Sequence, residues 1–336
     1  MHEEAAPPLF HHCRASALVI ELPMDKTWYQ ALNYEALVRA NKNSEAKAQE
    51  AFAKALTLLD TTESLLLHLG EYALLLGVEE TLLSKAYGAC LPAFEAMDSS
   101  VQVLTWEHPL WPKQVNSFAY CPRFLYVRGN ASLLSQPSIS VIGTRSPSLE
   151  GKKSAALSAY AIGKKSYVVA SGLALGIDGV AHKTALDSGF PTIAVLGTPL
   201  TSCYPPEHAQ LQEEIAKRGA LVSRFAPSSP TQKWFFLLRN RLMSALSLAS
   251  VVVEDRDGGG AVRQAAFALE QKKYLFFYQS SLDNHSFLWP KEFANRPRVF
   301  VVKQASDIPR VLEKAEKTRQ AVGKVVQKSV QLELDI

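Results

Sequence analysis

The strongest constraint on the fold is a regular alternation that begins at Ser138. Six short apolar runs, rich in residues that favour strands, are separated mostly by segments with helical spacing of apolar residues. The runs are SISVIG, SYVVAS, TIAVLG, ALVSRF, ASVVVE and KYLFFY. Strands that are apolar throughout need cover on both faces, and intervening helices supply it in a parallel sheet. The alternation therefore predicts an open, doubly wound α/β domain.

The segments before and after this alternation have different amino-acid compositions. Residues 27–96 are rich in Ala, Leu, Glu and Lys at helical spacing, which predicts a small helical domain whose leucines form its core. A proline- and aromatic-rich lead-in follows and is expected to pack over the sheet domain. After a last strand and helix, the C-terminal residues predict a tail or a final strand. We expect a helical domain at 1–98, a sheet domain at 99–317 and a tail at 318–336.

Composition narrows the classes of function. With 336 residues, 47% of them hydrophobic, the chain can bury a real core. A net charge of +4 is only mildly basic, so contact with nucleic acid has to come from local clustering. Cys13, Cys90, Cys121 and Cys203 lack C-x-x-C spacing, which argues against a zinc site or a disulfide framework. Without a membrane-length apolar run or an export signal, a cytoplasmic protein is expected.

Glycines gather at the carboxyl ends of the predicted strands. Ligands bind beyond this edge in open parallel sheets, and glycine lets a phosphate approach the N–H groups of the next helix. One such turn can be purely conformational, but several in register favour a phosphate-bearing ligand. The residues at these strand ends are Gly143, Thr144, Arg145, Ser171, Gly172, Gly197, Thr198, Gly258, Gly259 and Gly260.

The stretch SGLALGIDGVAH can be compared with the glycine-rich motif of dinucleotide-binding sites. Its Gly172, Gly176 and Gly179 do not form G-x-G-x-x-G, and no acidic residue ends the next strand, so a classical NAD site is disfavoured. A P-loop motif is absent from the sequence as well. Asp178 is expected to cap the following helix, with His182 one turn further along the same face. We interpret this pair as fixing the turn rather than performing chemistry.

Two arginines that precede an apolar segment, in RNRLMSALSLASVVVE, offer a second possible contact with phosphate. Arg239 and Arg241 flank Asn240, shortly before Ser244, and guanidinium groups bind phosphates in a bidentate manner. Their chemistry leaves two interpretations open: a functional cluster with Arg145, or ordinary solvated side chains. The lysines around the first helix of the sheet domain are most simply a solvated face; they are Lys152, Lys153, Lys164 and Lys165.

These stretches resemble successive motifs of the DprA/Smf DNA-processing proteins, over about residues 103–278. The segments concerned are SVIGTRSPSLEGKKSA, the stretch from SGLALGIDGVAH to LVSRF, and RNRLMSALSLASVVVE. The resemblance implies an extended Rossmann-like fold, sequence-independent binding of single-stranded DNA, and roles in DNA protection, transformation or recombination. It also implies RecA loading, self-association as dimers, and no catalytic residue, cofactor or metal. The matching phosphate-binding positions are Gly143, Arg145, Ser171, Gly172, Gly176, Asp178, Gly197, Arg239, Asn240, Arg241 and Ser244.

The chain also departs from that family pattern, which indicates a divergent member. Leu175 stands where an arginine is usual, and Arg224 replaces an acidic residue. We expect Leu175 to remove one cation from the pocket and Arg224 to restore one nearby. GGGAVRQA replaces the usual Ser-Gly-Ser-Leu loop, and the Val-Pro-Gly and Gly-Thr-Asn segments are not recognisable after YLFFY. DNA binding is expected to survive these changes better than contact with RecA or dimerisation.

Two further functions remain open at this stage. EDRDGGGAVRQA resembles the Gly-Gly-x-Gly turn with which nucleotide-sensing and nucleotide-cleaving proteins hold a phosphoribosyl group, and Glu254 lies near it. The other alternative is an adaptor whose helical N-terminal domain carries the function while the pocket is inactive.

Overall fold

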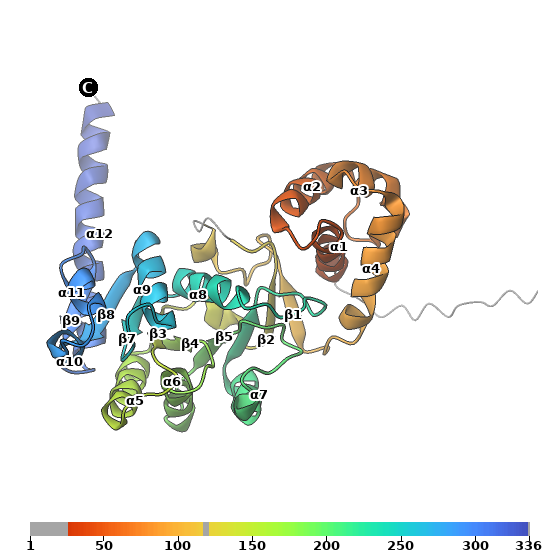
Figure 1. The fold of residues 1–336 in the computed structure, drawn as a ribbon. Helices are drawn as coiled ribbons and strands as arrows, with labels where there is room; N and C mark the ends of the chain where they lie inside the picture. The colour runs from red at the N-terminus through yellow and green to blue at the C-terminus, as the bar shows by residue number, and fades with distance from the viewer. Residues whose placement is uncertain (1–25, 117–120, 335–336) are drawn as a thin grey trace, which may run out of the picture.

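The computed structural model describes residues 26–116 and 121–334, with side chains through residue 320. Its N-terminal part is a helical domain, as the composition predicts (Figure 1). The helices are α1 (Lys26–Ala40), α2 (Glu45–Leu58), α3 (Leu69–Leu76) and α4 (Glu80–Glu95), with a 3-10 turn, η1 (Leu65–His68), before α3. Phe52, Tyr72 and Phe94 are almost fully buried at its centre.

Strands of the described residues form one sheet in the order β1-β2-β6-β5-β4-β3-β7-β8-β9. Strands β3 to β9 run parallel, whereas β1 and β2 extend the edge beyond β6 in antiparallel pairs. The strands are β1 (Val101–Leu104), β2 (Leu125–Gly129), β3 (Ser138–Ile142), β4 (Val168–Ser171), β5 (Thr192–Val195), β6 (Ala220–Ser223), β7 (Ala249–Val252), β8 (Tyr274–Tyr278) and β9 (Val299–Val302). The predicted mostly parallel, Rossmann-like α/β fold is therefore confirmed.

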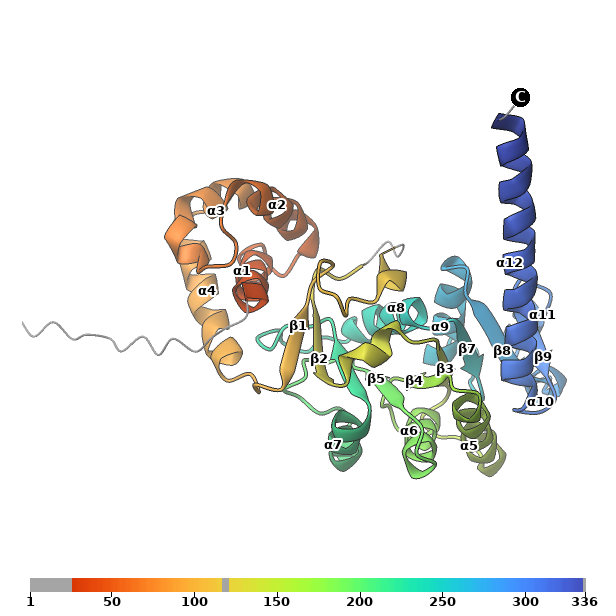
Figure 2. The same ribbon diagram turned by 180° about the vertical axis from the view of Figure 1, so that it is seen from behind.

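Helices cover both faces of this sheet (Figures 1 and 2). Adjacent residues of one strand enter different cores: Val251 of β7 packs beside α5 and α6, and Val252 packs beside α8 and α9. That arrangement explains why the strands are apolar without a period of two. The helices are α5 (Leu149–Lys164), α6 (Ile177–Asp187), α7 (Ala209–Arg218), α8 (Phe235–Leu246), α9 (Gly260–Glu270), α10 (Gln279–Asp283), α11 (Trp289–Ala294) and α12 (Asp307–Leu334).

The order of the strands fixes where a ligand can bind. From β3 the chain proceeds through β4, β5 and β6 on one side, and α8 then carries it back to β7 on the other side of β3. The connections after β3 and β7 therefore leave in opposite directions and open a crevice at their carboxyl ends.

Several expectations need correction. Leu58, Leu67 and Leu74 of the helical domain are more than half exposed, so its leucines are not all core. Residues 318–334 continue α12 rather than forming a strand, and the expected boundary at 317 lies inside this helix.

Cys90, Cys121 and Cys203 are free thiols, and Cys13 lies outside the described residues. Within the described ranges, no helix is both long and apolar enough to cross a bilayer.

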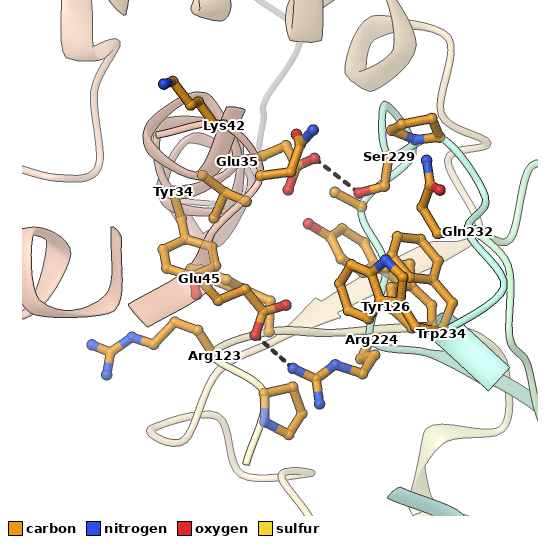
Figure 3. Close-up of a pocket in the computed structure, with 18 residues that line it drawn as sticks. Tyr34, Glu35, Lys42, Glu45, Arg123, Tyr126, Arg224, Ser229, Gln232 and Trp234 are labelled. Atoms are coloured by element: carbon orange, nitrogen blue, oxygen red, sulfur yellow. Dashed lines mark hydrogen bonds and ion pairs between the residues drawn. The ribbon is translucent and has the colours of Figure 1, made fainter. Parts of the chain in front are cut away.

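The helical domain packs against β2 through aromatic rings, with Phe124 beside Tyr34 and Phe52. Two polar contacts join the same surfaces (Figure 3). Arg224, just after β6, donates to the Glu45 carboxylate at 2.7 Å, and the Ser229 hydroxyl donates to Glu35 at 2.8 Å. Arg224 therefore does not restore a cation near the strand-end crevice, because its side chain is buried against the helical domain.

Glu35 makes the stability of this contact depend on pH. Burial raises the pKa of its carboxyl from 4.5 to about 7, and the Ser229 bond only partly offsets this. As the pH rises, the unfolded chain loses this proton at a lower pH than the folded chain does. The free energy of unfolding therefore decreases as the pH rises from about 4.5 to 7, by about 3 kcal/mol at most. Glu35→Gln should abolish that loss in urea unfolding at pH 5 and 8, and Glu50→Gln on the exposed face of α2 should retain it. An unchanged pH dependence in Glu35→Gln would contradict the assignment.

Candidate nucleic-acid interface

An open cleft of about 800 Å³ lies at the carboxyl ends of β3 and β7, where the strand order predicts a binding site. Four segments line it: the turn after β3, the turn from β4 into α6, α8 with the residues just before it, and the loop after β7 with the start of α9. Among the predicted site residues, the structure brings the following to its wall: Gly143, Arg145, Asp178, Arg239, Asn240, Gly259 and Gly260.

Arg239 of α8 is buried at the floor of this cleft. Its Nη1 atom donates to the carbonyl oxygens of Gly172 and Val195, at the ends of β4 and β5, and the latter bond measures 3.0 Å. Its Nε donates to Asn240 Oδ1 at 2.9 Å. Burial lowers the pKa of the guanidinium, and the charge of Asp178 opposes that shift. Arg239 thus joins two strand ends to α8, and most of its donors already have protein partners.

Asp178 and His182 hold the turn in a different way from the one predicted. Asp178 is the second residue of α6, not its cap, and its Oδ2 accepts the N–H groups of Gly172 and Ala174 at 3.1 and 3.4 Å. His182 is fully buried, with Nδ1 2.8 Å from the hydroxyl of Thr192. Burial lowers the pKa of His182 to about 3, so its ring is uncharged at neutral pH. Both side chains are buried and bonded within the protein.

The strand-end glycines mainly allow close packing within the protein. A Cβ atom at Gly143 would lie 2.5 Å from Cγ1 of Ile177, and one at Gly197 would lie 2.5 Å from the ring of Phe236. Gly176 has a φ of 79°, and a Cβ there would lie 2.8 Å from the carbonyl carbon of Arg145. The space that glycine leaves at these positions is filled by side chains and backbone, which differs from the expected approach of a phosphate.

Carboxylates already occupy two helix N-termini at this edge. Asp255 accepts the N–H groups of Ala261 and Val262 at the start of α9, at 2.8 and 3.3 Å. Glu254 accepts the Ser148 hydroxyl at 2.7 Å, just before α5. A phosphate on these amides would have to displace a carboxylate. The alternative of a phosphoribosyl pocket at the Gly258–Gly260 turn is therefore not favoured.

Exposed cations and aromatic rings complete the cleft, and the sequence analysis missed most of them. Arg145, Lys233, Arg256 and Arg263 are exposed and line it, and their side chains make no hydrogen bond or ion pair within the described ranges. Trp234 and Phe236 lie beside them, and Tyr204 packs on Phe236 with ring centroids 5.4 Å apart. The available signal was the run KWFF at 233–236, a lysine followed by aromatic residues, which two leucines separate from Arg239.

Other predicted residues lie away from the cleft or at its edge. Arg241 pairs with Glu270 at 3.2 Å and stacks over Phe267, so it does not join Arg145. Ser244 is buried within α8. Ser171 is also buried, and its hydroxyl donates to the carbonyl oxygen of Val141 at 2.6 Å. Leu175 is 36% exposed and lines a small side pocket with Arg145, Tyr204 and Arg239.

A family model described as DNA recombination-mediator protein A matches residues 102–309, more than half of the chain. The chain belongs to this family, the DprA/Smf proteins. The DNA processing protein DprA of Bacillus subtilis is 34% identical over 185 residues, which cover 55% of this chain and 61% of that protein. The Streptococcus pneumoniae DprA is 30% identical over 205 residues, covering 61% and 68%. Several curated relatives are thus matched over less than two thirds of their own length.

Solved structures agree with this assignment to the DprA/Smf family. The X-ray structure of DprA from Streptococcus pneumoniae superposes with a TM-score of 0.69 at 24% identity, over 83% of this chain and 97% of that one, and supports the fold. A second structure concerns the single-stranded DNA binding mode of DprA from Helicobacter pylori. It has a TM-score of 0.56 at 30% identity, over 65% of this chain and 99% of that one.

The packing of Arg239 against Gly172 predicts that this glycine is essential to the edge of the sheet. Gly172→Ala would place its Cβ inside the Arg239 guanidinium, so we expect a loss of about 1–3 kcal/mol in the free energy of unfolding. Gly260→Ala is the matched control, because nothing lies within 4 Å of a Cβ there; its change should stay within about 1 kcal/mol. Denaturant unfolding measures both, and equal stabilities of the two variants would refute this role of Gly172.

Proposed function

We propose that this DprA/Smf protein binds single-stranded DNA in the cleft between β3 and β7, without sequence preference. The observation that carries the proposal is the set of exposed cations that line the cleft with no ion pair among the described residues, beside the exposed ring of Trp234. Cations follow the phosphate backbone, and aromatic rings stack on any base, which together give affinity without sequence readout. The likeness to the Helicobacter pylori protein, whose structure concerns binding of single-stranded DNA, supports the same ligand.

In this proposal the site residues divide into two groups. Arg145, Lys233, Arg256 and Arg263 contact phosphates through their side chains, and Trp234, with Phe236 beside it, stacks on bases. Stacking needs bases that are not already paired in a duplex, which favours a single strand. The supporting group holds the loops in place and consists of Gly143, Ser171, Gly172, Gly176, Asp178, Gly197, Arg239 and Asn240.

We propose a binding protein without catalytic turnover, acting in the cytoplasm. The two aspartates at the cleft support this reading, because both are committed to the protein: Asp178 accepts the N–H of Gly172, and Asp255 accepts the N–H of Ala261. His182 does not line the cleft, and it is buried and uncharged. No group of three or more potential metal-ligating side chains occurs within the described residues.

The proposal predicts a specific loss on removal of two exposed cations. Arg145→Ala with Lys233→Ala should weaken binding of a labelled single-stranded oligonucleotide by about 10- to 100-fold at low salt. The slope of log K against log salt should fall by about 1.4, since each phosphate contact contributes about 0.7. Fluorescence anisotropy over a salt series measures both quantities.

The matched control removes the same charge elsewhere. Lys152→Ala with Lys153→Ala changes two exposed lysines of α5 that do not line the cleft. This variant should retain the wild-type slope and nearly all of the affinity. Equal losses in the two double variants would mean that net charge, not the cleft, determines binding, and the proposal would fail.

Family membership supports two further proposals, self-association as a homodimer and loading of RecA onto the bound strand during transformation or recombination. Sedimentation equilibrium should give twice the chain mass of 37.0 kDa. RecA ATP hydrolysis on a strand already covered by single-strand binding protein should start sooner when this protein is added. A single-chain mass at every concentration, or an unchanged lag, would refute the corresponding proposal.

A further inference from the structure

A second pocket, of about 350 Å³, lies between the helical domain and the sheet domain (Figure 3). Aromatic side chains form much of its wall: Tyr34 comes from α1, Phe124 and Tyr126 from the start of β2, and Trp234 and Phe235 from the start of α8. Its volume and lining are those of a site for a small planar group, since such sites are concave and largely apolar with a few polar contacts.

The charged groups of this pocket are of both signs, since Lys42, Arg123 and Arg224 line it together with Glu35 and Glu45. Glu45 is paired with Arg224 at 2.7 Å, and Glu35 accepts the Ser229 hydroxyl. Burial raises the pKa of the Glu35 carboxyl to about 7, so much of it carries a proton at neutral pH. The pocket therefore combines aromatic walls with a few polar groups, which suits a planar ring with a hydrogen-bonding edge.

The pocket adjoins the DNA cleft. Trp234 lines both, and it is 45% exposed. Its neighbour Lys233 lines the cleft, and Gln232 on the other side lines the pocket, where Figure 3 shows its side chain near Ser229. A strand held by Lys233 would thus have its phosphate in the cationic cleft while the attached base is next to the aromatic pocket.

We propose that this interdomain pocket receives one nucleobase of the single strand bound in the cleft. The base would lie among Tyr34, Tyr126 and Trp234, where stacking on rings is available to any base. Its edge would meet the Glu35 carboxyl, which can accept a hydrogen bond and, when protonated, also donate one. The inference rests on the proposed function, because the backbone has to be held in the cleft. It gives the helical domain a part in DNA binding.

Photocrosslinking tests this placement directly. Short oligonucleotides carrying 5-iodouracil are bound to the full-length protein and irradiated, and crosslinked peptides are identified by mass spectrometry. We expect crosslinks at Tyr34, Phe124 or Tyr126, which line the pocket but not the cleft, in addition to Trp234 or Phe236. Gln232→Trp, an exposed position at the pocket wall, should fill the pocket and reduce the pocket crosslinks about tenfold. Crosslinks in the cleft should persist in that variant.

The outcomes separate the two proposals. Crosslinks at Trp234 and Phe236 alone, with none at Tyr34, Phe124 or Tyr126 and with normal strand binding, would overturn the pocket and leave the proposed function intact. Pocket crosslinks that survive unchanged in Gln232→Trp, with its fold verified by circular dichroism, would also overturn it. Absence of both binding and crosslinks in the wild-type protein would refute the proposed function itself.

Discussion

The buried guanidinium of Arg239 holds together the edge of the sheet on which the binding cleft depends. It bonds the carbonyl oxygens of Gly172 and Val195 from α8, while Asp178 gathers the N–H groups of the turn after β4. The N–H groups of the Arg239 side chain thus serve as hydrogen-bond partners for these two backbone carbonyl oxygens. The cost of burying its charge is limited by those bonds and by the nearby carboxylate of Asp178. The residues that we propose to bind the strand can then remain exposed around it.

This edge differs from a sheet edge whose helix N-termini hold a phosphate. Asp255 accepts amide groups in the first turn of α9, and Glu254 accepts the amide and the hydroxyl of Ser148 just before α5. Positive charge for a ligand therefore has to come from side chains such as Arg145 and Lys233. Long, exposed arginine and lysine side chains of this kind can bind phosphates along a nucleic-acid backbone whose shape varies. A cleft of this kind suits a flexible polymer better than one small nucleotide in a fixed pose.

The sequence predicted the strands of the sheet domain well because buried parallel strands are continuous apolar runs. Because the strand ends meet at one edge, it also predicts a binding site there, which stays a prediction. It failed where a side chain finds its partner across a long separation in the chain. Arg224 pairs with Glu45, and Glu254 with Ser148, and neither contact follows from local spacing. The role of the glycines was also misjudged, since the atoms that fill the space beside Gly143 and Gly197 belong to other elements.

The central claim is that exposed side chains of the cleft at the carboxyl ends of β3 and β7 bind the strand. A structure of the protein with a short single-stranded oligonucleotide is its most direct test. The account predicts phosphates beside Arg145 and Lys233, bases against Trp234 or Phe236, and Asp255 still bonded to the start of α9. A phosphate seated on the α9 amides with Asp255 displaced, or a strand bound elsewhere on the molecule, would contradict it.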